Sequence, residues 1–160
     1  MRTVFVALRA LVFASGFLFL WGWLALSLRI FDQRFEVQFP WRTTLAGIIL
    51  MAVGGILVLA CIGVFVMWGH GTPAVFDPPR AFVAVGPYRY VRNPMYLGGW
   101  LLLLGFGLWK HSPSMLVFGL PWIFLAHLFV VYVEEPGLQR KFGETYEAYC
   151  KAVNRWIPKR

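Results

Sequence analysis

Two long apolar stretches constrain this 160-residue chain more than any other feature. Residues 4–28 contain a single charged side chain, Arg9, and residues 43–68 contain none. A helix needs roughly 20 residues to cross the hydrocarbon core of a bilayer, so each stretch is long enough to span a membrane. Only 14% of the residues are charged, against about 25% in an ordinary soluble domain. We therefore expect an integral membrane protein.

Two shorter apolar segments, residues 95–109 and 115–133, lie further along the chain. The sequence between them, Lys110-His111-Ser112-Pro113, is typical of a tight turn. Spans of this length are helical in lipid, because the backbone polar groups must find partners within the segment. The sequence therefore predicts an all-α polytopic membrane protein with about four transmembrane helices, of which the last two form a hairpin.

A different pattern comes after the last span, in residues 136–153. Its larger apolar side chains recur at helical spacing and share one face: Leu138, Phe142, Tyr146, Tyr149 and Val153. Charged residues occupy the other positions, so we predict a C-terminal amphipathic helix at the membrane interface. Residues 1–160 then form one domain, with two transmembrane helices in residues 1–68 and a cofactor-binding half in residues 69–160.

Four crossings place both termini and the 69–95 loop on one side of the membrane. Most of the basic residues fall on that side: Arg2, Arg80, Arg89, Arg92, Arg140, Lys141, Lys151, Arg155, Lys159 and Arg160. The other side carries Arg29, Arg34, Arg42 and Lys110. The positive-inside rule then favours a multi-pass protein of a bacterial inner membrane, with its termini and active site in the cytoplasm. The net charge of +8 reflects this topology, and no segment resembles a nucleic-acid-binding module.

The densest polar motif stands just before the third apolar segment. It reads Gly86-Pro87-Tyr88-Arg89-Tyr90-Val91-Arg92-Asn93-Pro94-Met95-Tyr96-Leu97-Gly98. Polar groups at a membrane boundary are costly unless something uses them. The predicted topology brings this motif to the same face as Glu134, Glu135 and Arg155. Such a pocket suits a zwitterionic cofactor with an extra cation, such as S-adenosylmethionine, although other cationic or amphipathic ligands would also satisfy it.

The same residues carry a family resemblance. The motif at residues 86–98 resembles the Arg-His-Pro-x-Tyr-x-Gly motif of the isoprenylcysteine carboxyl methyltransferase family, which includes relatives of the phospholipid N-methyltransferases. Glu134-Glu135, Phe142-Gly143, Tyr146, Tyr149 and the tail Arg155-Trp156-Ile157-Pro158 resemble the family's second motif. The two matches cover residues 70–158 at the family's spacing. The resemblance implies a membrane-embedded S-adenosylmethionine-dependent methyltransferase.

Carried over residue by residue, the resemblance implies a cofactor shell. Its members would be Tyr90, Val91, Arg92, Asn93, Pro94, Tyr96, Gly98, Glu134 and Glu135. Asn93 stands where the carboxyl methyltransferases have histidine. Asparagine donates and accepts hydrogen bonds but does not titrate, so a positioning role is retained and an acid–base role is not.

We further expect Arg92, Glu135 and Arg155 to be catalytic, because methyl transfer requires an aligned acceptor and, for an amine, a proton acceptor. His70, Tyr146 and Tyr149 are expected to bind the substrate. The acceptor is a lipophilic molecule, either the carboxylate of a prenylcysteine-like compound or the amine of a phospholipid headgroup. No metal site is expected, because the two cysteines, Cys61 and Cys150, lack zinc-binding spacing and are interpreted as a buried apolar residue and a free thiol.

Two other functions remain open on the sequence alone. Membrane sterol reductases resemble this fold in their C-terminal half, so a reductase using a nicotinamide cofactor is one alternative. A non-enzymatic lipid-binding membrane protein is the other. Only the methyltransferase predicts saturable binding of S-adenosylmethionine that depends on the motif and on the glutamate pair. The oligomeric state is not predicted.

Overall fold

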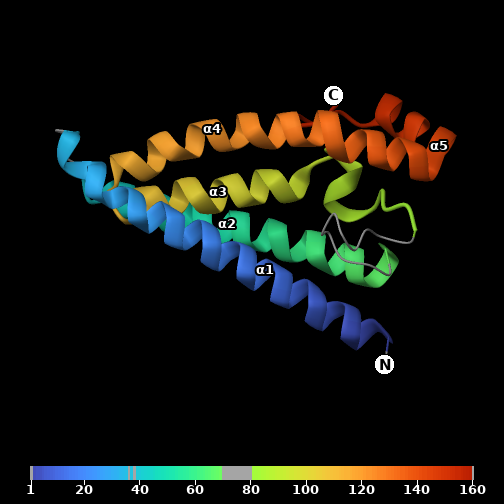
Figure 1. The fold of residues 1–160 in the computed structure, drawn as a ribbon, viewed down its shortest axis with the longest axis horizontal. Coiled ribbons are helices and arrows are strands. Elements are labelled where there is room, and N and C mark those ends of the chain that lie inside the picture. The colour runs from blue at the N-terminus through green and yellow to red at the C-terminus, as the bar shows by residue number, and fades with distance from the viewer. Residues whose placement is uncertain (1, 36, 38, 70–80, 160) are drawn as a thin grey trace.

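A bundle of antiparallel helices forms the protein (Figure 1). The computed structural model describes residues 2–35, 37, 39–69 and 81–159. Five α-helices lie in these ranges: α1 (Arg2–Ser27), α2 (Arg42–Val64), α3 (Pro94–Trp109), α4 (Pro113–Phe129) and α5 (Glu135–Ala152). The described residues contain no strand, and the predicted all-α fold is confirmed.

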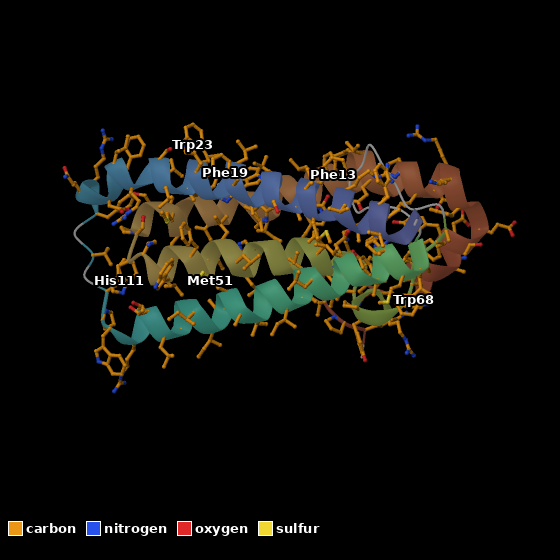
Figure 2. All side chains as sticks on the ribbon, turned by 90° about the horizontal axis from the view of Figure 1, so that it is seen from below. Phe13, Phe19, Trp23, Met51, Trp68 and His111 are labelled. Carbon is orange, nitrogen blue, oxygen red and sulfur yellow. The ribbon has the colours of Figure 1, made fainter. Side chains whose placement is uncertain are left out.

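The helices have the lengths and surfaces of membrane spans. Three helical stretches are long and apolar enough to cross a bilayer, namely Val4–Arg34, Arg42–Gly69 and Pro113–Ala152, and α3 is a shorter apolar helix. Large apolar side chains cover the outside of the bundle, as Figure 2 shows for Phe19 and Trp23 on α1. Phe19 is 77% exposed, and an outer surface with so many large apolar side chains fits a protein whose solvent is lipid.

Glycines bring α2 and α3 into close contact. Gly47 of α2 faces Gly105 of α3, and Gly54 of α2 faces Gly98 of α3. A Cβ atom added to Gly54 would stand 2.6 Å from the Gly98 carbonyl oxygen, so only glycine permits this backbone separation. Small residues at helix interfaces are the usual means of close packing in membranes.

The predicted hairpin between α3 and α4 is confirmed. His111 takes a positive φ of 52° in the turn, and the Ser112 side chain accepts a hydrogen bond from the Met115 backbone N–H at the start of α4. Asp32, in the connection after α1, accepts hydrogen bonds from Ser112 Oγ at 2.7 Å and from the Ser114 N–H at 3.1 Å. These contacts close the end of the bundle that lies opposite the termini (Figure 1).

Helix α4 continues into α5 through a π-helical turn at Val130–Glu134. A similar π-helical turn, Phe65–Gly69, ends α2. Single π-helical turns occur frequently at functional sites. Both lie at the end of the bundle where α5 and the termini are found (Figure 1).

The amphipathic C-terminal helix is not continuous, contrary to the single helix predicted for residues 136–153. Gly143 has φ +50° and ψ −127°, which breaks the helical path in the middle of α5. The chain turns back there, toward the end of the bundle (Figure 1). The side chains after the break therefore pack against the protein, and Tyr146 is only 4% exposed.

Candidate active site

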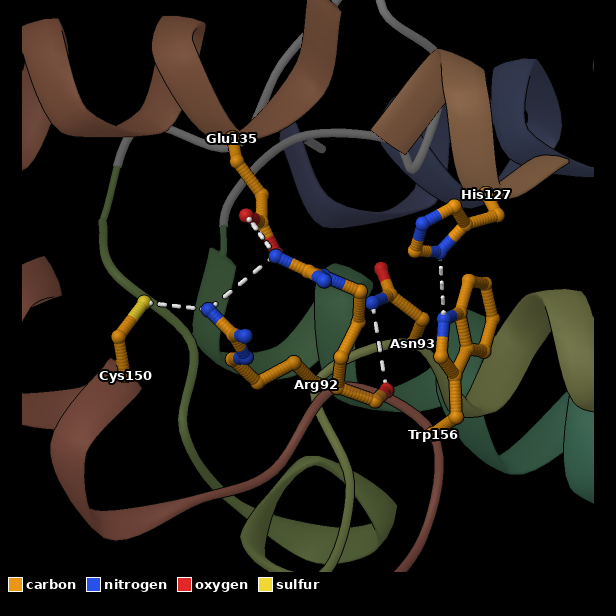
Figure 3. A network of polar contacts seen from close by, with 7 residues as sticks. Arg92, Asn93, His127, Glu135, Cys150 and Trp156 are labelled. Atoms are coloured by element: carbon orange, nitrogen blue, oxygen red, sulfur yellow. Dashed lines mark hydrogen bonds and ion pairs between the residues drawn. The ribbon is translucent and has the colours of Figure 1, made fainter. Parts of the chain in front are cut away.

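Three segments meet at the end of the bundle that carries α5 (Figure 3). They are the start of α3, the junction of α4 with α5, and residues 153–157, which we name the C-terminal strap. Each brings polar side chains to the boundary of an otherwise apolar bundle. The topology predicted from the sequence places these segments together, and the structure shows that they are in direct contact.

Glu135, at the start of α5, is the centre of the polar network. Its carboxylate accepts two hydrogen bonds from Arg155 of the strap, from Nε to Oε1 and from Nη2 to Oε2, both at 2.8 Å. Arg92 Nη1 lies 3.2 Å from the same Oε1. Hydrogen bonding to Glu135 raises the pKa of Arg155 above its usual value, against the effect of burial. One carboxylate thus holds two guanidinium groups from distant parts of the sequence.

Arg92 has a second side-chain partner, Cys150 of α5. Its Nη1 donates to the Cys150 sulfur at 2.6 Å. Cys61 is buried as predicted, but Cys150 belongs to the polar network rather than being an isolated thiol. Among the described residues, Arg92 Nε is buried without a hydrogen-bond partner. Buried polar atoms without partners are uncommon, and this one offers a donor to a ligand.

Asn93 ties the strap to the motif. It precedes Pro94 at the start of α3, and its Nδ2 donates to the Arg155 carbonyl oxygen at 3.3 Å. The neighbouring Arg92 backbone N–H donates to the Asn154 carbonyl oxygen at 2.9 Å. Asn93 is 6% exposed. A neutral amide therefore joins the strap to the motif in this chain.

A second set of contacts surrounds Glu134. Tyr96 of α3 donates its hydroxyl proton to Glu134 Oε2 at 2.9 Å. The Tyr96 ring packs edge-on against Trp156 of the strap, and Trp156 Nε1 donates to His127 Nδ1 of α4 at 3.1 Å. The site therefore combines a second carboxylate with three ring systems.

Aromatic side chains form the wall between the motif and α5. Phe82 lies against the rings of Phe142, Tyr146 and Tyr149, with the Tyr149 centroid at 5.1 Å. Tyr149 donates its hydroxyl proton to the Tyr88 carbonyl oxygen at 2.6 Å. Burial raises the pKa of the Tyr88 phenol well above its usual value, so it stays neutral.

The structure brings most of the predicted site residues together. Arg92, Asn93, Tyr96, Glu134, Glu135 and Arg155 are in mutual contact, directly or through one neighbour. Val91 and Pro94 are buried beside them, and Tyr146 and Tyr149 belong to the aromatic wall.

Three predicted residues lie elsewhere or outside the description. Tyr90 is 67% exposed, and Gly98 faces α2, where an added Cβ would meet Val58 and Gly54. Their cofactor contacts stay predictions. His70 lies outside the described residues.

Sequence reasoning missed three participants. Cys150 was not connected to Arg92, Phe82 was not noticed as the centre of an aromatic cluster, and His127 was not paired with Trp156. The only sequence signal for this pair was a histidine inside an apolar span.

The comparison with protein families supplies the class of protein. The phospholipid methyltransferase family matches residues 42–145, which run from the start of α2 to the second part of α5. A comparison with curated proteins found no match. The family match covers more than half of the chain and contains the motif and the glutamate pair. The family match thus defines the class as that of the membrane methyltransferases. The chain belongs to the phospholipid methyltransferase family, in agreement with the resemblance noted in the sequence.

Proposed function

We propose that this protein transfers a methyl group from S-adenosylmethionine to a lipophilic acceptor at the membrane surface. One observation carries the proposal: the motif residues Arg92, Asn93 and Tyr96 meet Glu134 and Glu135 at the end of an apolar helix bundle. The family match supports the reaction type. The cofactor and the acceptor are inferred from the chemistry of the site.

The donor set fits the methyl donor. Glu134 and Glu135 offer carboxylates for its amino group, and the unpartnered Nε of Arg92 offers a hydrogen bond to its carboxylate. The rings of Tyr96 and Trp156 offer aromatic faces to a sulfonium cation. When bound, the donor supplies an electrophilic methyl group on positively charged sulfur.

An amine of a phospholipid headgroup is the first acceptor that we propose. An ammonium group must lose a proton before it can accept a methyl group, so a carboxylate near the acceptor would assist. Both oxygens of Glu135 accept hydrogen bonds from Arg155, whereas the described hydrogen bond of Glu134 uses Oε2 alone. We therefore propose that Glu134 accepts the proton that the ammonium group loses. Glu135 holds Arg92 and Arg155 in place.

A carboxylate of a prenylcysteine-like compound is the second acceptor. A carboxylate needs no general base, and two guanidinium groups at the site could orient it. Arg92 and Arg155 provide these groups. In either case the apolar body of the acceptor would stay in the lipid, while the chain aligns the reacting atoms and excludes water.

The test is incubation of the purified protein with methyl-labelled S-adenosylmethionine and a total membrane lipid extract. Label in stable N-methyl headgroups would support the amine, and label in base-labile esters would support the carboxylate. Glu134→Gln should abolish N-methylation and also weaken binding of the donor, because the amide loses the charge that we assign to the donor's amino group. The matched control is Glu144→Gln on the exposed side of α5, which should behave as the wild type. Binding of a nicotinamide cofactor, or no binding of S-adenosylmethionine, would overturn the proposal.

A further inference from the structure

His127 is a polar residue in the membrane-spanning helix α4, and the proposed reaction assigns it no role. Its Nδ1 accepts a hydrogen bond from Trp156 Nε1 at 3.1 Å, and the two rings lie 6.2 Å apart. Because Nδ1 accepts, the imidazole is neutral with its proton on Nε2. A polar group within a membrane span is costly and is retained where it has a use.

The partner of His127 belongs to the C-terminal strap, which the motif and α5 hold at three further points. The Asn154 carbonyl oxygen accepts a hydrogen bond from the Arg92 backbone N–H, and the Arg155 carbonyl oxygen accepts one from the Asn93 side chain. The Arg155 side chain binds Glu135. All three contacts lie on the α5 side of Trp156. Among the described residues, the His127 contact joins this far end of the strap to α4 (Figure 3), beside the ring contact of Trp156 with Tyr96 of α3.

We propose that His127 is a positioning residue for the methyl-donor site. Through Trp156 it holds the strap across the junction of α3, α4 and α5, and we name this pair the His127–Trp156 latch. The Trp156 ring then stays against Tyr96, and Arg155 stays on Glu135. The proposal rests on the proposed function, because it assigns the held residues to donor binding.

The test removes the hydrogen bond from either side. Trp156→Phe retains an aromatic ring but has no N–H, and His127→Leu has no acceptor. Each should raise the KM for S-adenosylmethionine about tenfold while changing kcat less than twofold, because the strap is loosened but the reacting groups remain. The double variant should be no worse than either single variant, since both remove the same bond.

Two further variants separate positioning from general stability. His127→Asn restores an acceptor oxygen close to the place of Nδ1 and should return the KM to within about threefold of the wild type. Trp100→Phe removes a comparable bond elsewhere in the bundle, from Trp100 Nε1 to the Gly119 carbonyl oxygen at 3.0 Å. This control should leave the KM unchanged. An equal rise in KM for Trp100→Phe would overturn the proposal.

A measurement made in the absence of S-adenosylmethionine tests this inference separately from the proposed function. Amide hydrogen exchange of residues 153–157 should be faster in Trp156→Phe and His127→Leu than in the wild type, and unchanged in Trp100→Phe. Faster exchange in a protein that binds no S-adenosylmethionine would support the latch and refute the donor site. Unchanged exchange in both latch variants would overturn the latch itself.

Discussion

At the scale of single residues, Glu135 decides whether the site holds together. It joins Arg92, which precedes α3, to Arg155, which follows α5. The three side chains are 16%, 12% and 29% exposed, so water screens their charges only partly. Asn93 contributes a bond of a different kind, from a neutral amide to a backbone oxygen. The site is thus held by one shared negative charge together with uncharged hydrogen bonds.

Replacing Glu135 by glutamine tests this arrangement. The amide keeps the shape of the side chain but removes the charge, which leaves two partly buried guanidinium groups without a counter-charge. We expect Glu135→Gln to lower the free energy of unfolding by about 2 kcal/mol, below the cost of breaking a fully buried pair. Equilibrium unfolding in mixed micelles measures this difference. A Glu135→Gln variant as stable as the exposed control Glu144→Gln would contradict it.

At the scale of elements, the contact between α2 and α3 places the motif. Opposed glycines let the two backbones approach each other, and α3 starts directly after the motif. A change in the distance between these helices would therefore shift Asn93 and Tyr96, which stand at the start of α3. The kink in α5 has a matching effect on the other side, because it turns Tyr146 and Tyr149 toward Phe82.

Two neighbouring glycines of α2 give a matched test of the helix contact. Gly54→Ala would place a Cβ atom 2.6 Å from the Gly98 carbonyl oxygen, whereas Gly55→Ala would have Leu102 Cδ2 at 3.9 Å as its nearest neighbour. We expect Gly54→Ala to destabilise the protein by about 1–3 kcal/mol. Gly55→Ala should be neutral or slightly stabilising. Thermal unfolding in detergent compares the two, and equal effects would contradict the predicted close contact.

Two glycines of α5 give a matched test of its kink. Gly143 has φ +50°, which L-residues with a side chain rarely adopt, so Gly143→Ala should cost about 2 kcal/mol. Gly137 lies in the same helix with nothing within 4 Å of an added Cβ, and Gly137→Ala is the control. Near-ultraviolet circular dichroism should report a changed environment of the aromatic cluster in the first variant alone. An unchanged spectrum for Gly143→Ala would show that the kink does not position these rings.

At the scale of the whole molecule, the two ends of the bundle differ in chemistry. One end carries the site, α5 and both described ends of the chain, and the other carries the hairpin turn and Asp32 (Figure 1). Three long helical stretches and the shorter α3 together return the described chain to the end of the bundle at which it began (Figure 1). Which side faces the cytoplasm is a prediction from the distribution of lysine and arginine.

Cysteine labelling tests the orientation. Gln33 and Glu144 are exposed at opposite ends of the bundle. In a Cys150→Ser background, Gln33→Cys should react with a membrane-impermeant maleimide in intact spheroplasts, and Glu144→Cys only after lysis. Cys61 is buried and should not contribute. Labelling of Glu144→Cys in intact spheroplasts would reverse the predicted orientation.

Helix existence and topology could be predicted from the sequence because apolar length alone determines them. That topology also predicted the meeting of Arg92 with the glutamate pair, since it placed both at one end of the bundle. The contacts of Cys150 and Trp156 could not be found in this way. They depend on the break at Gly143, whose backbone conformation leaves no mark on the helical spacing of the apolar residues. A continuous α5 was the natural prediction from that spacing.

The π-helical turn at Val130–Glu134 affects where the chain can lose a residue and keep its fold. A π-helical turn holds about one residue more than an α-helical turn, so it can lose one residue and become α-helical without rotating α5 relative to α4. A deletion within regular helix instead turns everything beyond it by about 100°. Deletion of the exposed Tyr132 should therefore leave an active protein, and deletion of Leu125, which is also exposed, should not. In vivo methylation by the two deletants would show whether loss of a residue is tolerated better in this π-helical turn than in regular helix.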